Sequence, residues 1–280
     1  MAAANVAFSH PRAVSAALNY IVPSVGRPYR YNFDPPPDVA YTNACYQPHP
    51  VVIQNLRPIA DTLSLDVQGF ELRTQPSVVK DFYDEDDLRQ VYYREIEEML
   101  KACSGAHSAL VFDHTIRRRA DAEYSKKPGL PREPVPRVHN DYTFKSGPQR
   151  VRDLVPEHAE ELLQRRYSII NVWRPIRGPL QDTPLAVCDA RSVQPEDLVP
   201  LDLIYRDRTG EIYMVQYSDR HRWYYAPEMS SDEILLLKTF DSAEDGRARF
   251  AVHGAFEDPN TPPNRLPRES IEVRALVFHS

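Results

Sequence analysis

Residues 233–278, EILLLKTFDSAEDGRARFAVHGAFEDPNTPPNRLPRESIEVRALVF, contain three short apolar runs separated by Pro, Gly, Asp and Ser. Runs of this length, rich in β-branched and aromatic residues and bounded by turn residues, indicate β-strands. Five similar runs precede them: RYSIINVWRPI (166–176), PLAVCDARSV (184–193), DLIYR (202–206), EIYMVQYS (211–218) and HRWYYAP (221–227). Eight short strands in succession predict a mainly β fold, a β-barrel or a double-sheet jelly roll (a double-stranded β-helix).

One long helix is predicted upstream of these strands. Residues 84–105, DEDDLRQVYYREIEEMLKACSG, begin with acids, which favour a helix N-terminus. Apolar residues then recur at steps of three and four, and Gly105 is a typical stop. With a short helix in VPEHAEELLQRR (155–166), it should buttress a jelly-roll core over residues 81–280. Residues 1–80, Pro-rich and largely irregular, are expected to be an arm packed on that core, giving one domain overall.

The composition argues against several classes of protein. The net charge is −6 with both signs interspersed, and the basic stripe that nucleic-acid binding needs is missing. Three scattered cysteines (Cys45, Cys103 and Cys188) argue against a disulfide framework or structural zinc and favour a reducing cytosol. No run approaches the roughly 18 apolar residues that span a membrane, and the N-terminus lacks a signal-peptide core. The basic run at 117–119 is interpreted as a solvated loop or an anion-facing surface.

A metal site is indicated by VPRVHNDYT (135–143). His139 and Asp141 are two residues apart, so on an extended strand their side chains point the same way. They would supply one imidazole and the carboxylate of the 2-His-1-carboxylate triad of non-haem Fe(II) oxygenases. A second histidine from a distant strand would complete it, and both His253 and His221 lie in predicted strands. The other His-x-acid pair, at 158–160, is interpreted as helix surface.

The order of these motifs resembles the Fe(II)/2-oxoglutarate-dependent oxygenase superfamily. H-x-D is followed by a lone histidine in ARFAVHGAF and by R-x-S in PRESIEVRALVF. In that superfamily the second strand of a jelly roll carries H-x-D, the seventh the distal histidine, and the eighth an arginine for 2-oxoglutarate. The resemblance implies that His139, Asp141 and His253 bind Fe(II), and it favours His253 over His221 as the third ligand.

The same resemblance implies a site for the co-substrate. Arg268, helped by the Ser270 hydroxyl, would clamp the far carboxylate of 2-oxoglutarate, because a guanidinium fork matches a carboxylate. Arg274, on the same strand face, is kept as the alternative clamp. Tyr142 and Asn171 are further candidates for contact with the keto-acid, with ordinary packing as the competing interpretation.

The match is more specific than the superfamily. RYSIINVWRPI, PLAVCDARSV, DRHRWYYAPEM, SSDEILLLKTFDS, HGAFEDP and PRESIEVRALVF together resemble one group within it. That group holds the cephamycin 7-alpha-hydroxylase component, gibberellin desaturase-like proteins and aspergillic-acid-type hydroxylases. The similarity covers roughly residues 80–278, and 20–80 more loosely. Members are often labelled methyltransferases, but this chain shows no Gly-rich loop after a strand for S-adenosylmethionine, so we reject that label.

Several ring-bearing and basic residues are candidates for a substrate pocket, where aromatic walls are common. They are Trp173, Arg174, Tyr217, His221 and Trp223. Each has a plainer interpretation: Trp173 as core, Arg174 in an ion pair, and the aromatic stretch around Trp223 as a lid or a packing cluster.

Together these observations predict an oxygenase that uses Fe(II), 2-oxoglutarate and O₂ and releases succinate and CO₂. It would hydroxylate, desaturate or cyclise at an unactivated C–H bond of a small specialised metabolite or amino-acid-derived compound. The alternatives are a non-catalytic jelly-roll partner of another biosynthetic enzyme and a cupin-like metal protein. The intact His139, Asp141 and His253 argue against the first, and Arg268 argues against the second. We expect a small-molecule substrate, no nucleic acid or membrane, and leave a homodimer open.

Overall fold

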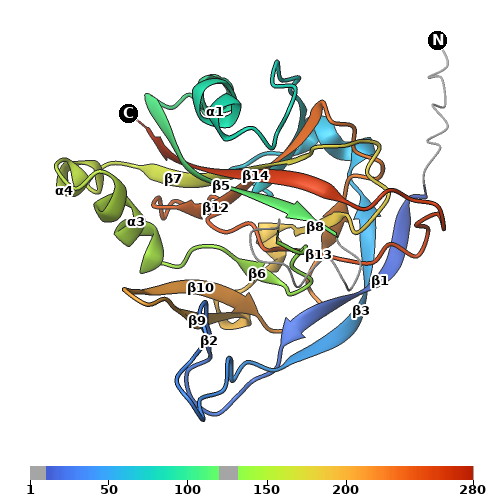
Figure 1. Cartoon of the computed structure of the whole chain (residues 1–280), viewed down its shortest axis with the longest axis horizontal. Helices are drawn as coiled ribbons and strands as arrows, with labels where there is room; N and C mark the ends of the chain where they lie inside the picture. Colours follow the sequence, from blue (N-terminus) through green and yellow to red (C-terminus); the bar gives the residue numbers. More distant parts are fainter. Residues whose placement is uncertain (1–10, 120–131, 280) are drawn as a thin grey trace.

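Within residues 11–119 and 132–279, the part of the chain that the computed structural model describes, fourteen strands form two β-sheets (Figure 1). One sheet has nine strands, in the order β1-β3-β11-β8-β13-β6-β10-β9-β2; the other has five, in the order β4-β12-β7-β14-β5. The strands are β1 (Ala13–Ile21), β2 (Tyr29–Tyr31), β3 (Tyr46–Asn55), β4 (Phe70–Thr74), β5 (Ser108–Arg118), β6 (His139–Asn140), β7 (Tyr167–Pro175), β8 (Leu185–Cys188), β9 (Leu198–Ile204), β10 (Thr209–Val215), β11 (Trp223–Tyr225), β12 (Glu233–Asp241), β13 (His253–Ala255) and β14 (Glu269–Phe278). The mainly β fold predicted from the spacing of apolar runs is confirmed.

An apolar core joins the two sheets. Trp173 of β7 and Leu235 and Leu237 of β12 belong to the five-stranded sheet, and they pack with Leu185 and Val187 of β8 in the nine-stranded sheet. All five side chains are buried. Removing this apolar surface from water is the main force that holds the sheets face to face.

Strand β14 has one face toward a helix and the other toward the interior. Ile271 and Val273 share an apolar cluster with Ile96 and Leu100 of the long helix. Successive strand residues point to opposite faces, so Glu272 and Arg274 point inward, where they line a cavity between the sheets. The helix therefore decides which face of β14 is left for the polar interior.

The long helix predicted for residues 84–105 is confirmed. It consists of α1 (Glu85–Asp87), a π-helical turn (Leu88–Tyr92) and α2 (Tyr93–Ser104). The Asp84 carboxylate caps it by accepting two backbone N–H groups of the first turn. Gly105 ends it at a φ of 66°, a conformation that glycine adopts without steric cost.

Two further helices follow the H-x-D motif. α4 (Ala159–Leu162) is shorter than the predicted helix over 155–166, and α3 (Ser146–Leu154) was not predicted. The sequence hid α3 because Gly147 and Pro148, at its start, are residues that usually break helices. Proline is tolerated in a first turn, and Gly147 packs so closely on the Phe240 ring that a Cβ would lie 2.6 Å from it. Short 3₁₀ segments span Arg57–Thr62, Ala190–Ser192 and Pro195–Asp197.

Residues 13–55 are more regular than predicted. β1 pairs with β3 along its whole length, β11 pairs with β3 in parallel, and β2 pairs with β9. β4 forms an edge of the five-stranded sheet beside β12. The division of the chain into an arm over 1–80 and a core over 81–280 stays a prediction. Residues 1–10, which carry most of the signal-peptide prediction, lie outside the described residues.

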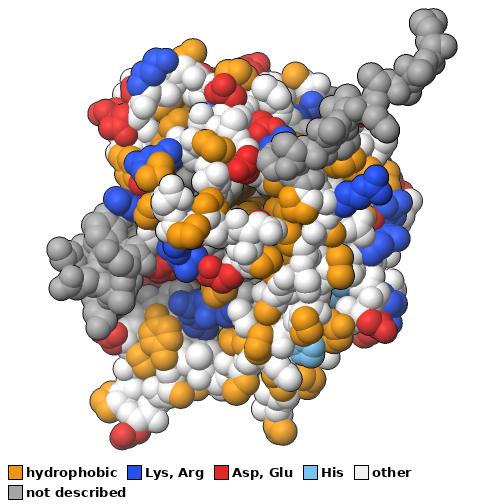
Figure 2. Space-filling view, turned by 90° about the vertical axis from the view of Figure 1, so that its right-hand side faces the viewer, with side chains coloured by type: hydrophobic (Ala, Val, Ile, Leu, Met, Phe, Trp, Pro, Cys, Tyr) orange, Lys and Arg blue, Asp and Glu red, His pale blue; other side chains and the backbone are white. Residues whose placement is uncertain are grey.

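The surface agrees with the mixed charge of the sequence. Figure 2 shows Lys and Arg as well as Asp and Glu side chains on the same face, among many hydrophobic ones. Among the described residues, no helix combines the length and the apolar character needed to cross a membrane.

Candidate metal centre and its cavities

The pairing of two very short strands brings the predicted metal ligands together. β6 contains only His139 and Asn140, and His139 lies directly opposite His253, the first residue of β13. Their ring centroids are 4.4 Å apart. Asp141 follows β6 immediately, and one ligand atom from each of His139, Asp141 and His253 lies within 4.8 Å of the other two.

Backbone carbonyls fix which nitrogen each histidine presents. The Nδ1 atom of His139 lies 2.8 Å from the carbonyl oxygen of Arg137, and that of His253 lies 2.8 Å from the carbonyl oxygen of Ala251. A carbonyl can only accept, so Nδ1 carries the proton in both rings. Both Nε2 atoms are therefore free to bind a metal, the arrangement in which a hydrogen bond behind the ring fixes its tautomer.

The carboxylate of Asp141 is held from behind. Its Oδ2 accepts hydrogen bonds from Nδ2 of Asn171 (2.8 Å) and Nε of Arg274 (3.2 Å). Its Oδ1 lies 3.5 Å from Nε2 of His139. The oxygen on the histidine side thus stays available for a shared ligand.

Electrostatics keeps the ligands in the protonation states that metal binding requires. Burial, together with the neighbouring His253, lowers the pKa of His139 to about 3. Burial alone would raise the pKa of Asp141, but Arg274, the two neighbouring histidines and the hydrogen bond from Asn171 together outweigh this and hold it below its usual value. In the metal-free protein His139 is therefore neutral and Asp141 ionised at neutral pH. Two neutral imidazoles and one carboxylate on one side of a metal fit non-haem Fe(II), with further positions left open.

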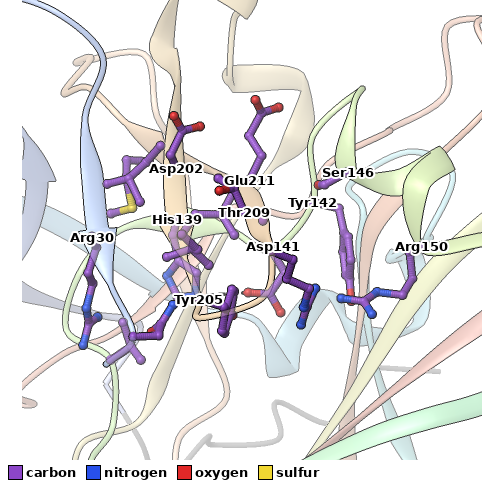
Figure 3. Close-up of a pocket in the computed structure, with 18 of the residues that line it drawn as sticks. Arg30, His139, Asp141, Tyr142, Ser146, Arg150, Asp202, Tyr205, Thr209 and Glu211 are labelled. Carbon is purple, nitrogen blue, oxygen red and sulfur yellow. Dashed lines mark ion pairs between the residues drawn. The ribbon is translucent and has the colours of Figure 1, made fainter. Parts of the chain in front are cut away.

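Two cavities meet at this centre. The inner one is lined by Trp173, His253 and Arg268 among others, and the outer one encloses about 470 Å³. His139 and Asp141 line both. Figure 3 shows the outer cavity with these two side chains at its centre and with Arg30 and Arg150 on opposite sides. The cavities also share Arg117, Val135 and Arg274, so a metal here would face two adjoining spaces, of which the inner one encloses only about 30 Å³.

The two arginines considered for the co-substrate lie in different surroundings. Arg268 is buried; its Nε donates to Ser270 Oγ (3.1 Å), its Nη1 to the carbonyl oxygen of Thr183 (2.7 Å), and its guanidinium stacks on Trp173. It has no ion pair with a described residue. Arg274 instead forms ion pairs with Asp141, Asp113 and Glu272.

Other predicted site residues are divided between the cavities and the rest of the fold. Tyr142 lines the outer cavity and Trp173 the inner one, while Asn171 contacts Asp141. Arg174 points the other way, toward the helix, with its guanidinium over the rings of Phe82 and Tyr92. The structure does not bring Arg174 to either cavity.

The aromatic stretch around Trp223 forms a separate cluster. His221 stacks on Tyr20 and lies 3.2 Å from Asp197, and the Trp223 indole N–H donates to the Tyr20 hydroxyl. Tyr217 stacks on His49 at 4.1 Å between ring centroids. The inner and outer cavities are lined by other residues than Tyr217, His221 and Trp223. A role in substrate binding stays a prediction for each of these three.

Three cavity residues escaped the sequence analysis. Arg117 lines both cavities, although its basic run was interpreted as a loop or a surface; it lies on β5. Arg137 lines the outer cavity, and its place two residues before His139 could have revealed it. Arg30 comes from β2, and nothing in its sequence neighbourhood pointed to the site.

A jelly roll that carries two histidines and an aspartate at the junction of two cavities defines the class of non-haem Fe(II) oxygenases. Residues 18–278 match the family described as an oxidoreductase/YMDC permease-like domain. The chain is 36% identical to the hydroxylase/desaturase efuI of Hormonema carpetanum, covering 86% of this chain and 87% of that protein. It is 32% identical to the Fe(II)/2-oxoglutarate-dependent dioxygenase nvfI of Aspergillus novofumigatus, covering 89% and 90%.

A solved structure agrees with these relatives. The iron and alpha-ketoglutarate-dependent endoperoxidase NvfI superposes with a TM-score of 0.86 at 27% identity, over 96% of this chain and 99% of that one. The chain therefore belongs to the Fe(II)/2-oxoglutarate-dependent dioxygenase family, with His139, Asp141 and His253 as its facial triad. The predicted jelly roll, enzyme class, metal and co-substrate are confirmed.

Proposed function

We propose that this dioxygenase hydroxylates, desaturates or cyclises a small specialised metabolite or amino-acid-derived compound at an unactivated C–H bond. The observation that carries the proposal is the triad, two of whose residues, His139 and Asp141, line both of the adjoining cavities. The names of the relatives, hydroxylase/desaturase and endoperoxidase, support this range of outcomes. The narrower resemblance, to the cephamycin 7-alpha-hydroxylase group, belongs to the same proposal.

The chain's own residues have distinct tasks in this mechanism. Fe(II) with 2-oxoglutarate and O₂ supplies an oxidant able to remove hydrogen from an unactivated C–H bond, with release of succinate and CO₂. His139, Asp141 and His253 would hold the metal from one side. Asn171 and Arg274 orient the carboxylate of Asp141. The walls of the outer cavity would hold the target C–H bond near the metal and exclude water.

Arg268 is proposed as the clamp for the far carboxylate of 2-oxoglutarate. Its surroundings support it over Arg274, which already has three acidic partners. Burial lowers the pKa of Arg268 to about 9, so an anion placed beside its guanidinium would relieve an electrostatic cost. Ser270, already hydrogen-bonded to Arg268, would hold the same carboxylate.

We also propose a cellular location for the enzyme. The three cysteines are free, which supports a reducing cytosol. A homodimer stays open.

The test of the proposed function is an anaerobic spectrum. Fe(II) and 2-oxoglutarate are added to the metal-free protein, and a visible metal-to-ligand charge-transfer band is expected when the keto-acid chelates iron. The band should be lost in His139→Ala and His253→Ala and kept in His221→Ala, since His221 lies in the Tyr20 cluster. If iron binds without a band, the protein is a metal protein without 2-oxoglutarate. If iron does not bind, the non-catalytic partner becomes the better hypothesis.

The clamp has its own test. Charged hydrogen bonds contribute about 1.5–3 kcal/mol, so Arg268→Gln should raise the KM for 2-oxoglutarate by about 10- to 150-fold. The matched control is Arg265→Gln, three residues away and exposed, which should leave the KM unchanged. An unchanged KM in Arg268→Gln, with iron still bound, would exclude Arg268 as the clamp.

A further inference from the structure

The outer cavity carries more positive than negative charge. Its described lining contains eight Lys or Arg and five Asp or Glu side chains. The acids are already engaged: Asp202 and Glu211 both pair with Arg27, and Asp113 pairs with Arg274. The remaining two are Asp153, which lies 4.0 Å from the guanidinium of Arg150, and the triad residue Asp141. The excess cations therefore have no counter-charge among the described lining residues.

Arg30 and Arg137 are two of these excess cations. Neither forms an ion pair or a side-chain hydrogen bond with a described residue, and both are partly buried. Aromatic rings hold them instead: Arg30 lies 5.8 Å from the ring centroid of Tyr41, and Arg137 lies 5.4 Å from that of Tyr46. Cation–π contacts leave the N–H groups at the guanidinium edge free to donate.

Arg137 is tied directly to the metal centre. Its carbonyl oxygen accepts the Nδ1–H of His139 at 2.8 Å. Two residues of extended chain separate their Cα atoms by roughly 7 Å. Arg30 lines the same outer cavity as His139 (Figure 3). A group bound by these arginines would therefore lie a short molecule's length from the metal.

We propose that the substrate of this oxygenase is an acid whose carboxylate binds to Arg30 and Arg137 in the outer cavity. This proposal rests on the proposed function, because the bound acid is a substrate only if the protein acts as an oxygenase. A guanidinium fork matches the two oxygens of a carboxylate, and such charge-assisted hydrogen bonds are about twice as strong as neutral ones. Burial and, after it, the nearby charge of Arg30 lower the pKa of Arg137, and a carboxylate bound to both arginines would relieve this repulsion.

The two anion sites are distinct. Arg268, the proposed co-substrate clamp, lines the inner cavity, and Arg30 and Arg137 line only the outer one. 2-Oxoglutarate at Arg268 would therefore leave the Arg30–Arg137 pair for a second acid. The carboxylate would fix one end of the substrate and so select which C–H bond faces the metal.

The experiment compares matched acids and amides. 1-Naphthoic acid with 1-naphthamide, and indole-3-acetic acid with indole-3-acetamide, are the probes. Binding to the anaerobic Fe(II)- and 2-oxoglutarate-loaded protein is measured by equilibrium dialysis. The wild type should bind each acid about tenfold or more tightly than its amide, the ratio expected for one charged hydrogen bond. In the Arg30→Gln/Arg137→Gln double variant the ratio should fall to near one. Arg206→Gln, an exposed arginine outside the cavity, should keep the wild-type ratio.

The outcomes separate this proposal from the proposed function. Equal binding of acids and amides by the wild type overturns it, as does a double variant that keeps the preference or acids that fail to bind at millimolar concentration. The charge-transfer band is recorded in the same samples. A band without acid preference leaves the oxygenase and removes the acidic substrate. An acid preference that depends on Arg30 and Arg137, without a band, supports the anion site and contradicts the oxygenase.

Discussion

The two oxygens of the Asp141 carboxylate have different partners: Oδ2 accepts hydrogen bonds from the protein, and Oδ1 is available to bind a metal. Asn171 and Arg274 both donate to Oδ2, and the Asn171 amide oxygen in turn accepts from the Thr239 hydroxyl at 3.2 Å. Groups behind a metal ligand fix its direction, and their loss typically costs 10- to 100-fold in metal affinity. The amide of Asn171 is directed at this iron ligand, and its contact with the keto-acid stays a prediction.

Asn171→Ala is therefore expected to weaken Fe(II) binding by about 10- to 100-fold. Isothermal titration under anaerobic conditions would measure the dissociation constant. Asn55→Ala is the matched control, because it also removes a buried amide but lies far from the triad in β3. If both variants bind Fe(II) as the wild type does, Asn171 does not position Asp141.

At the level of single elements, β7 and β14 are strands with both faces buried, and the two faces have different surroundings. Ile170, Val172 and Arg174 of β7 face the helix, and Asn171 and Trp173 face the interior. Arg174 is an exception in the helix-facing set, since it is charged and almost fully buried. It donates to the Gln75 carbonyl oxygen, and its Nε has no partner among the described residues.

Arg174→Ala should destabilise the fold without affecting co-substrate binding. Removing a large buried side chain leaves a cavity and typically costs about 2–5 kcal/mol. We expect a loss of this size in the free energy of unfolding, measured with urea, and an unchanged KM for 2-oxoglutarate. Arg191→Ala, which removes an exposed arginine from the 3₁₀ segment Ala190–Ser192, should cost less than about 1 kcal/mol. Full stability of Arg174→Ala with a raised KM would instead support the pocket role considered from the sequence.

His279, at the end of β14, gives this strand pair a pH dependence. Its Nε2 lies 3.2 Å from the Ser168 hydroxyl of β7, and burial lowers its pKa from 6.5 to about 4. Between these values the unfolded chain binds a proton that the folded chain does not, so stability must fall as the pH decreases from 6.5 to 4. His279→Gln should show a shallower fall in urea denaturation over this range. Identical curves for both proteins would contradict the role of His279; above roughly pH 6.5 no difference in slope is expected.

The whole molecule depends on strands from the two ends of the chain. β3, from the N-terminal part, pairs with β1 on one side and with β11 on the other. Ile53 of β3 lies opposite Trp223 of β11, and both are fully buried. The Asp66 carboxylate also reaches β12, where it pairs with the buried Lys238 ammonium. These contacts join the first eighty residues to both sheets.

A chain that lacks residues 1–56 is expected not to fold. The deletion removes β1, β2 and β3 and exposes the edges of β11 and β9, and open apolar edges favour aggregation. Circular dichroism and size-exclusion chromatography would show an aggregated or unfolded product. A chain that starts at residue 11 keeps every described strand and is the control. A soluble, iron-binding product from the larger deletion would support a separable N-terminal arm.

Local pattern was sufficient for much of this protein. Alternating apolar runs and turn residues predict strands, and acids followed by a period of three to four predict the helix over 84–105. These features follow from the geometry of a few consecutive residues. The H-x-D pair by itself offers only two candidate metal ligands, and the order of the later motifs was needed to support them. The choice of His253 over His221 needed the resemblance to a family, since both histidines lie in predicted strands. Their spatial difference lies in pairing: β13 lies beside β6, and His221 packs on Tyr20.

Long-range packing determined which side chains point into the cavities. Both alternate faces of β14 are buried, so its sequence alone does not say whether Arg268 and Arg274 or the apolar set faces the interior. The helix covers the apolar set and so directs the arginines inward. Likewise, Arg30 of β2 reaches the outer cavity only because β2 pairs with β9. A pattern of two residues per repeat fixes which side chains share a face, but the partner that covers that face lies far away in the chain, and only the packed molecule brings it there.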